Sequence, residues 1–186
     1  MCSGVDVNEL LERAAKIKLL LMDVDGVMTD GALYQVPAPA GGIVETKGFN
    51  SQDGIALRWL AWNGIDTGVI SGRVSPATEE RCRQLECKYV YQGHVEKIPL
   101  FEEILEKSGL AREQVCFAGD DLTDVAVMRR AGLAVATANA RPEVKRFAHL
   151  VTEAPGGHGA IREVCELLLK AQGHWDALLR KYEAYD

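Results

Sequence analysis

Two aspartates separated by one residue open the most informative segment of the sequence. Asp23 and Asp25 begin the octapeptide DVDGVMTD at positions 23–30, directly after an apolar run over 18–22. A carboxylate such as Asp23 can attack phosphorus and form an aspartyl phosphate, which divides one displacement into two easier ones. A second carboxylic acid two residues later, Asp25, can protonate the leaving alkoxide and then deprotonate the attacking water. Acidic residues also end strands without any chemical role, so the pair alone leaves both interpretations open.

Three further segments carry polar residues suited to phosphate. Ser71 and Gly72 follow an apolar run over 66–70, where a hydroxyl and exposed amides can hold a phosphate oxygen. Lys97 can neutralise both a carboxylate nucleophile and a phosphoryl group, although alone it would be an ordinary surface lysine. The segment FAGDDLTD at 117–124 places an acidic cluster after another apolar run, and hard oxygen ligands of this kind suit Mg²⁺. Because several carboxylates would repel a dianionic phosphate, a divalent cation is expected.

Short apolar runs alternate with helix-like segments along most of the chain. The apolar runs predict strands over 17–22, 66–70, 89–91, 115–118 and 133–136. Between them, apolar residues spaced by three and four predict helices over 54–63, 77–86, 98–108 and 121–131. This alternation predicts an α/β fold with a Rossmann-like layered architecture around a central parallel sheet. Ligands bind beyond the carboxyl ends of the strands in such sheets, so the residues just after each strand are the functional candidates.

Three segments fall outside this alternation. Residues 31–48 contain two short apolar stretches around a Pro-Ala-Pro-Ala-Gly-Gly turn, which predicts a β-hairpin flap after the first strand. A tail over 174–186 can continue as an amphipathic helix. Residues 156–159 fit either a mobile closing segment or a glycine-rich turn before the last helix. The length of 186 residues predicts a single domain over 1–186.

The composition limits the classes of function. With 47% hydrophobic residues and no apolar run near the roughly 20 residues that cross a bilayer, no membrane partner is expected. A net charge of −6 argues against a nucleic-acid surface and favours a small ligand, whose charge the site must balance locally if it is anionic. The N-terminal segment lacks the order of a signal peptide, which predicts a cytoplasmic location. Five cysteines without a CxxC pair are expected to be reduced and mostly buried; they are Cys2, Cys82, Cys87, Cys116 and Cys165.

The four polar segments together resemble the haloacid dehalogenase (HAD) superfamily, in which DxDG-[VT]-x-[TS]-D follows the first strand and the serine, lysine and acidic motifs follow in this order. The resemblance implies a Mg²⁺-dependent phosphatase that works through a phosphorylated Asp23. It implies that the side chains of Asp23 and Asp120 and the backbone carbonyl of Asp25 hold Mg²⁺. Acids at the positions of Asp121 and Asp124 would anchor metal-bound water or the lysine, with Asp124 orienting Lys97. The phosphate contacts that it implies are Thr29, Ser71, Gly72 and Lys97.

Further motifs narrow the resemblance to the 3-deoxy-D-manno-octulosonate 8-phosphate phosphatase family, over about 16–173. They are a compact hairpin in place of a large cap domain, FNSQDG at 49–54, ISGR at 70–73, YQG at 91–93, GDDL at 119–122 and GGHGAIRE at 156–163. Members of this family form homotetramers in which a neighbour's hairpin or tail helps to close each active site. The hairpin turn and the tail are longer here than is usual in the family. The segments that cover the active site are therefore expected to differ from those of the family.

The substrate that this resemblance implies is a small anionic sugar phosphate. A sugar that carries both a carboxylate and a phosphate needs paired cations, and the family's basic positions are all Arg or Lys here. For Arg58 and Arg81, an exposed helix face without a substrate role is the alternative. The substrate contacts implied by the resemblance are Asp25, Asn50, Ser51, Gln52, Asp53, Gly54, Arg58, Arg73, Arg81 and Lys97.

Three other functions fit parts of the sequence. A phosphatase for 2-keto-3-deoxynononate 9-phosphate resembles the chain over the same motifs, but such enzymes tend to carry an acidic residue where Arg73 stands. A signalling receiver domain also uses a phosphorylated aspartate with Mg²⁺, but its phosphoacceptor follows the third strand. A non-catalytic module associated with a sugar nucleotidyltransferase would have lost catalytic residues, whereas the whole set is present here.

Overall fold

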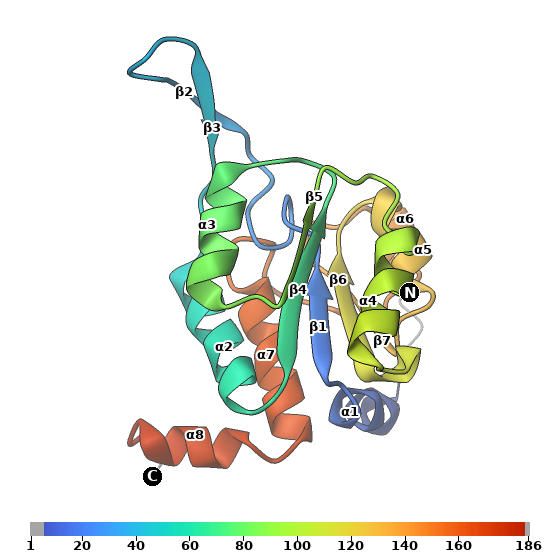
Figure 1. Ribbon diagram of the computed structural model, residues 1–186. Coiled ribbons are helices and arrows are strands. Elements are labelled where there is room, and N and C mark those ends of the chain that lie inside the picture. Colours follow the sequence, from blue (N-terminus) through green and yellow to red (C-terminus); the bar gives the residue numbers. More distant parts are fainter. Residues whose placement is uncertain (1–5, 185–186) are drawn as a thin grey trace.

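A six-stranded parallel sheet forms the centre of the molecule, with helices on both of its faces (Figure 1). The structure is a computed structural model that describes residues 6–184. The strand order is β5-β4-β1-β6-β7-β8. β1 (Leu19–Met22) lies in the middle, between β4 (Asp66–Ser71) and β6 (Val115–Gly119). The predicted α/β class and central parallel sheet are therefore confirmed.

The other elements surround these three strands. The outer strands of the sheet are β5 (Tyr89–Gln92), β7 (Leu133–Ala136) and β8 (Leu150–Val151). The α-helices of the described range are α1 (Val7–Ala15), α2 (Ser51–Trp62), α3 (Pro76–Leu85), α4 (Ile98–Ser108), α5 (Val125–Met128), α6 (Pro142–Lys145), α7 (Ala160–Ala171) and α8 (Trp175–Lys181). Two 3₁₀ turns, η1 (Arg112–Gln114) and η2 (Leu122–Asp124), precede β6 and α5.

Each face of the sheet has its own apolar core. In β1, Leu20 and Met22 belong to the cluster that includes α2 and α7, whereas Leu19 and Leu21 belong to the cluster that includes α4 and α5. Successive side chains of a strand point to opposite faces, so burial on both faces produces continuous apolar runs. This is why the central strands could be found in the sequence and why their carboxyl ends are rigidly held.

The predicted strands match β1, β4, β5, β6 and β7 to within two residues at each end. The single helix predicted over 121–131 is wrong, because η2 and the short α5 occupy this range. The Asp121 side chain accepts a hydrogen bond from the Leu122 amide, and Asp124 accepts two from the amides of Asp120 and Asp121. Aspartates that bond to nearby backbone compete with helical hydrogen bonds, so the segment begins as a tight 3₁₀ turn. The sequence analysis assigned no structure to the segments that form α1, α6 and β8.

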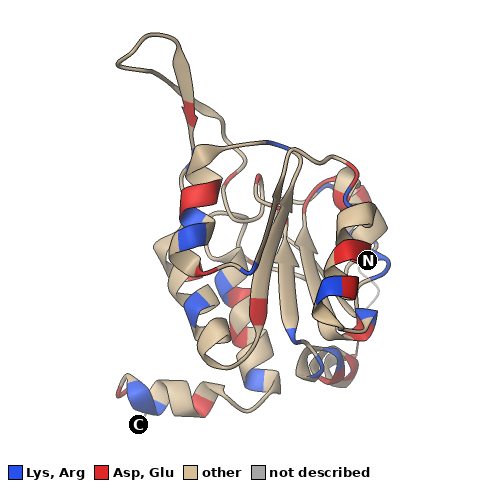
Figure 2. Cartoon of the chain, in the orientation of Figure 1, with Lys and Arg blue, Asp and Glu red and all other residues tan. Residues whose placement is uncertain are grey.

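An antiparallel hairpin of β2 (Tyr34–Pro37) and β3 (Ile43–Thr46) projects from the body of the molecule (Figure 1). Its register pairs Val36 with Val44, and all of its large apolar side chains are exposed. Figure 2 shows one acidic position on the hairpin, and Glu45 is the only charged residue between positions 34 and 46. The hairpin predicted from the sequence is present, and its action as a flap over the site stays a prediction.

The tail forms α8, which packs against α2 and α7. Trp59 donates a hydrogen bond from its indole nitrogen to the Tyr182 hydroxyl at 3.2 Å, and its ring meets that of Trp175 edge-on. Of the cysteines that the structure describes, all four are free and only Cys87 is not fully buried. Cys2 and the last two residues of the tail lie outside the described residues. Within residues 6–184, no helix combines the length and the apolar character needed to cross a membrane.

Candidate active site

Four of the predicted site residues lie at the carboxyl edge of the sheet. Asp23 follows β1, Ser71 ends β4 and Asp120 follows β6, and these three strands are direct neighbours. Lys97 precedes α4, the helix after β5, and only 3% of its surface is exposed. Parallel strands end at a common edge, so residues separated by almost one hundred positions meet there.

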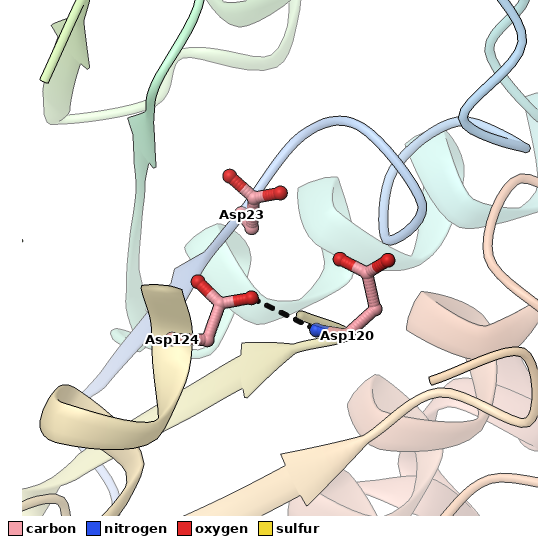
Figure 3. Close-up of side chains that lie close together, drawn as sticks. All are labelled: Asp23, Asp120 and Asp124. Atoms are coloured by element: carbon pink, nitrogen blue, oxygen red, sulfur yellow. Dashed lines mark hydrogen bonds between the residues drawn. The ribbon is translucent and has the colours of Figure 1, made fainter. Parts of the chain in front are cut away.

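Lys97 connects two of the carboxylates. Its Nζ lies 2.6 Å from Asp23 Oδ1 and 2.6 Å from Asp124 Oδ1. Burial opposes the charged form of Lys97, but the attraction of Asp124 and Asp23 together outweighs it and raises the pKa of the ammonium. Both oxygens of Asp124 form hydrogen bonds. Oδ1 accepts from Lys97, and Oδ2 accepts from the amides of Asp120 and Asp121. Figure 3 shows the bond from the Asp120 amide. This is the arrangement expected if Asp124 orients Lys97.

Asp120, unlike Asp23 and Asp124, has no basic side chain of the described residues bound to its carboxylate. The carboxylates of Asp23, Asp120 and Asp124 converge (Figure 3), with one oxygen of each within 4.8 Å of the others. Asp120 Oδ1 is buried, and no donor among the described residues reaches it. Burial, with repulsion from Asp124 and Asp23, raises the pKa of Asp120 to about 8. Burial likewise raises the pKa of Asp23 to about 6, against the opposing effect of Lys97.

The donor set fits a hard divalent cation. Asp23 keeps one carboxylate oxygen that Lys97 does not bind, and Asp120 offers Oδ1, which binds no donor among residues 6–184. Oxygen ligands of this type suit Mg²⁺, and its charge would remove the repulsion that raises the pKa of Asp120. Since Asp124 is already occupied by Lys97 and two amides, Asp23 and Asp120 are the members of the cluster left to hold the ion.

The loop after β1 is held against Asp120 at Gly26. Gly26 has a φ of +90°, and a Cβ there would lie 2.2 Å from Asp120 Oδ2, so only glycine fits. The Gly26 carbonyl accepts hydrogen bonds from Thr137 Oγ1 at 3.2 Å and from Asn139 Nδ2 at 2.9 Å. Asn139 Oδ1 in turn accepts from the Gly156 amide at 2.6 Å. Thr137 and Asn139 were not among the predicted site residues, although both follow β7 and the residues just after strands were expected to be functional.

Asp25 lies in a ring of four charges. Lys47 Nζ donates to Asp25 Oδ1, and Arg73 Nε lies 4.0 Å from Asp25 Oδ2. Glu45 closes the ring, with Oε2 2.5 Å from Arg73 Nη2 and Oε1 3.6 Å from Lys47 Nζ. The hydrogen bond from Arg73 lowers the pKa of Glu45. Asp25 and Arg73 were predicted as site residues, whereas Glu45 and Lys47 were not. Their signal in the sequence is a pair of opposite charges two residues apart in extended chain, where both side chains lie on one face.

The predicted phosphate contacts have different surroundings. Ser71 is buried, and its Oγ accepts the Arg73 amide at 3.2 Å, which folds the turn that exposes Gly72. Thr29 is also buried, but its hydroxyl donates to the Val24 carbonyl and accepts the Gly31 amide inside the loop after β1. Thr29 therefore stabilises this loop, and its contact with phosphate stays a prediction.

The predicted substrate segment at 50–54 begins α2. Asn50 is the N-cap, and its Oδ1 accepts from the amides of Gln52 and Asp53, while Ser51 and Gln52 are exposed. Asp53 is buried and accepts the Arg162 amide at 2.8 Å, which satisfies a donor in the first turn of α7. Burial raises the pKa of Asp53, and the bond from Arg162 opposes this shift. Asn50 and Asp53 thus have structural roles: they fix the first turn of α2, which carries the exposed Ser51 and Gln52.

Two of the predicted basic contacts bind other protein groups. Arg58 Nη1 lies 2.6 Å from Glu86 Oε1 at the end of α3. Arg81 donates to the Asn50 carbonyl at 3.3 Å, and a Cβ on Gly54 would lie 2.0 Å from its guanidinium, which explains the glycine. No ion pair joins either arginine to Asp23, Asp120 or Asp124 within the described range. Their contact with substrate stays a prediction.

The glycine segment at 156–159 packs on the loop after β1. The Gly157 amide donates to the Val27 carbonyl at 3.2 Å, and the Gly157 carbonyl accepts from Asn50 Nδ2 at 3.4 Å. Gly159 is the N-cap of α7. In this structure the segment is a turn before α7 that ties α2 to the loop carrying Asp23.

Known proteins share this sequence and this fold. The family of haloacid dehalogenase-like hydrolases matches residues 55–163. The 3-deoxy-D-manno-octulosonate 8-phosphate phosphatase KdsC of Escherichia coli K12 is 41% identical over 175 residues, which cover 94% of this chain and 91% of that protein. A solved structure of this phosphatase from Yersinia pestis is 42% identical with a TM-score of 0.86, covering 91% of this chain and 89% of that one. The Moraxella catarrhalis phosphatase, solved in complex with magnesium ion, phosphate ion and KDO, is 35% identical with a TM-score of 0.89, covering 95% of this chain and 99% of that one.

Proposed function

The chain belongs to the haloacid dehalogenase-like hydrolases and, within them, to the 3-deoxy-D-manno-octulosonate 8-phosphate phosphatase family, and we propose that it hydrolyses this sugar phosphate to the free sugar acid and inorganic phosphate. It is a phosphatase. The observation that carries the mechanism is the pairing of Asp23 with Lys97 at 2.6 Å beside Asp120, whose Oδ1 no donor among the described residues reaches. A nucleophile with an adjacent cation and a set of oxygen ligands for a second cation suits attack on a phosphate dianion.

In the proposed first step, a carboxylate oxygen of Asp23 attacks phosphorus. The bond between phosphorus and the sugar oxygen breaks, and Asp25 donates a proton to that oxygen. In the second step Asp25 takes a proton from water as the water attacks phosphorus, and the bond to Asp23 breaks. Lys97 neutralises negative charge on Asp23 and on the phosphoryl oxygens throughout, while Ser71 and the amide of Gly72 bind a phosphoryl oxygen.

We propose that Mg²⁺ is held by the side chains of Asp23 and Asp120 and by the backbone carbonyl of Asp25. When bound, the ion would neutralise the carboxylates and polarise the phosphoryl group. The orphaned Asp120 carboxylate supports this, as does the magnesium ion in the Moraxella catarrhalis complex. Asp124 is proposed to orient Lys97, and Asp121 to bind water near the ion.

The eight-carbon acid is the favoured substrate because the similar phosphatases reported above are named for it. In the proposed complex Arg73 binds the substrate carboxylate. Its side chain is 47% exposed and reaches the ring around Asp25 from the turn after β4. We further propose that Ser51 and Gln52 contact the sugar, with Arg58 and Arg81 as basic groups at its periphery, in a cytoplasmic, single-domain enzyme.

The proposed enzyme is a homotetramer in which a neighbour's hairpin or tail helps to close each site. Projection of the hairpin away from its own body supports this (Figure 1), as does its exposure of Tyr34, Val36, Ile43 and Val44. Exposed apolar side chains gathered on one element are typical of an interface.

One assay tests the substrate, the metal and the nucleophile together. Release of phosphate is measured from the eight-carbon acid phosphate, the nine-carbon acid phosphate and a neutral sugar phosphate, with Mg²⁺ and with excess chelator. The wild type should prefer the eight-carbon acid and lose activity in chelator. Asp23→Asn should abolish turnover of every ester without loss of fold, since the amide cannot attack phosphorus. Substantial residual turnover by Asp23→Asn would reject the covalent mechanism.

A further inference from the structure

Lys47 is a buried cation that the mechanism above does not use. It directly follows β3 at the base of the hairpin, and only 1% of its side chain is exposed. Burial of a lysine ammonium costs free energy unless a partner compensates it. The partner that it contacts most closely is Asp25, through a hydrogen bond to Oδ1, and Glu45 is more distant at 3.6 Å.

The strand geometry explains why both charges reach the site. Glu45 and Lys47 are two residues apart in extended chain, so their side chains point to the same face. Glu45 Oε2 binds Arg73 at 2.5 Å, and Glu45 Oε1 faces Lys47. The four charges alternate in sign around the ring and sum to zero. Lys47 binds one oxygen of Asp25 and Arg73 lies 4.0 Å from the other, so the carboxylate has a cation on each side.

We propose that Lys47 is a positioning residue for Asp25. Its ammonium holds the carboxyl group in place for proton transfer and stabilises the negative charge that develops on Asp25 as the proton passes to the leaving oxygen. The hairpin thereby supplies a part of the reaction machinery in addition to any role as a cover. This inference rests on the proposed function, because it assumes that Asp25 is the acid.

The test uses two esters without a carboxylate, so that the proposed contact between Arg73 and a substrate carboxylate does not enter the measurement. The alkoxide of n-butyl phosphate needs a proton to leave, whereas the phenolate of p-nitrophenyl phosphate leaves without one. The value of kcat/KM covers only the steps up to loss of the leaving group, so it reports the proton donation and not the later attack by water. The measured quantity is the ratio of kcat/KM for the alkyl ester to that for the aryl ester, in the full chain with saturating Mg²⁺.

Lys47→Met should lower this ratio on the order of 10- to 100-fold. This is less than the whole rate enhancement from general acid catalysis, which is on the order of 10²- to 10⁴-fold. Asp25→Asn should lower it at least as far. Lys47→Arg should restore most of the ratio because it keeps a cation beside Asp25. Lys88→Met is the matched control, since Lys88 pairs with Asp66 at 2.6 Å on the opposite edge of the sheet and should leave the ratio unchanged.

Equal losses of kcat/KM with both esters in Lys47→Met would overturn the proposal, because a merely structural lysine would affect them alike. Failure of Lys47→Arg to recover the ratio would also overturn it, and this arm remains informative if Lys47→Met does not fold. If Asp25→Asn itself leaves the ratio unchanged, the acid role of Asp25 in the proposed function is wrong, and the role of Lys47 falls with it.

Discussion

Asp120 carries a carboxylate that the described protein groups do not neutralise, although Asp23 and Asp124 lie within reach of the same point. Asp23 has Lys97, and Asp124 has Lys97 and two amides. The imbalance therefore falls on one residue, whose pKa rises to about 8 through burial and through repulsion by its neighbours. At the scale of single residues, this is the physical argument for a divalent cation.

The first prediction concerns this imbalance. Asp120→Asn should remove the rise in melting temperature that Mg²⁺ produces in the wild type, because a ligand stabilises only the protein that binds it. The metal-free variant should be no less stable than the metal-free wild type, since a like charge has been removed. Differential scanning calorimetry with and without Mg²⁺ measures both effects.

Asp121→Asn is the matched control for this variant. Asp121 is exposed, and asparagine preserves its cap on the Leu122 amide, so the shift with Mg²⁺ should remain. A full shift in Asp120→Asn would show that the ion binds elsewhere.

A second prediction at this scale concerns Arg73. Arg73→Ala should raise KM for the eight-carbon acid phosphate about 10- to 100-fold, the effect of a lost charge-assisted hydrogen bond. KM for a neutral phosphate ester should change much less. Steady-state kinetics on the two substrates measures the difference, and equal increases would show that Arg73 serves phosphate binding or the ring around Asp25 instead.

Among the elements, the loop after β1 depends on residues that follow β7 and on the turn before α7. Thr137 and Asn139 both bind the Gly26 carbonyl, and Asn139 also binds the Gly156 amide. Gly26 in turn contacts Asp120 so closely that no Cβ fits between them. The position of the catalytic loop is therefore set by three segments that are far apart in the sequence.

Asn139→Ala should destabilise the protein by about 1–2 kcal/mol, because it removes two hydrogen bonds, one to the Gly26 carbonyl and one from the buried Gly156 amide, which is left without its acceptor. It should also lower kcat, since the loop that carries Asp23 loses one of its anchors. Urea denaturation and steady-state kinetics measure the two effects. Thr137→Val is the control, because it removes one bond to the same carbonyl and leaves no amide unpaired. A larger loss in Thr137→Val than in Asn139→Ala would contradict the bridging role of Asn139.

At the scale of the whole molecule, charge and apolar surface are distributed differently. Acidic and basic residues lie mixed on the helices in the view of Figure 2, whereas the projecting hairpin carries apolar side chains with little charge. Ile43 is 70% exposed, which is costly for a side chain of this size unless another surface covers it. This contrast is what the proposed tetramer would explain.

Light scattering after size exclusion should therefore give a mass about four times that of the 20.3 kDa chain. Ile43→Lys should shift this mass toward smaller species, because it places a charge in the proposed interface. Val7→Lys on α1 is the control, since Val7 is 68% exposed at the other end of the molecule, and it should leave the mass unchanged. A monomeric wild type at micromolar concentration would rule the tetramer out.

The sequence alone predicted the strands and the functional residues that directly follow them in the chain. Strands buried on both faces appear as continuous apolar runs, and parallel strands end at one edge, so Asp23, Ser71 and Asp120 could be expected to meet before any coordinates were known. Lys97 and Asp124 followed from the order of the motifs, and the structure brings both into contact.

Only the tertiary structure could reveal what packs around those residues. The contacts of Lys47 and Glu45 with Asp25 and Arg73, and those of Thr137 and Asn139 with Gly26, join segments that are distant in the sequence. Arg58 likewise has its closest partner in Glu86 at the end of another helix. The predicted helix over 121–131 failed because side chains of the acidic motif bind the backbone that the helix would have used. The local sequence determines which side chains of a strand or helix are buried. Which side chains bind one another is decided only when the sheet brings distant segments together.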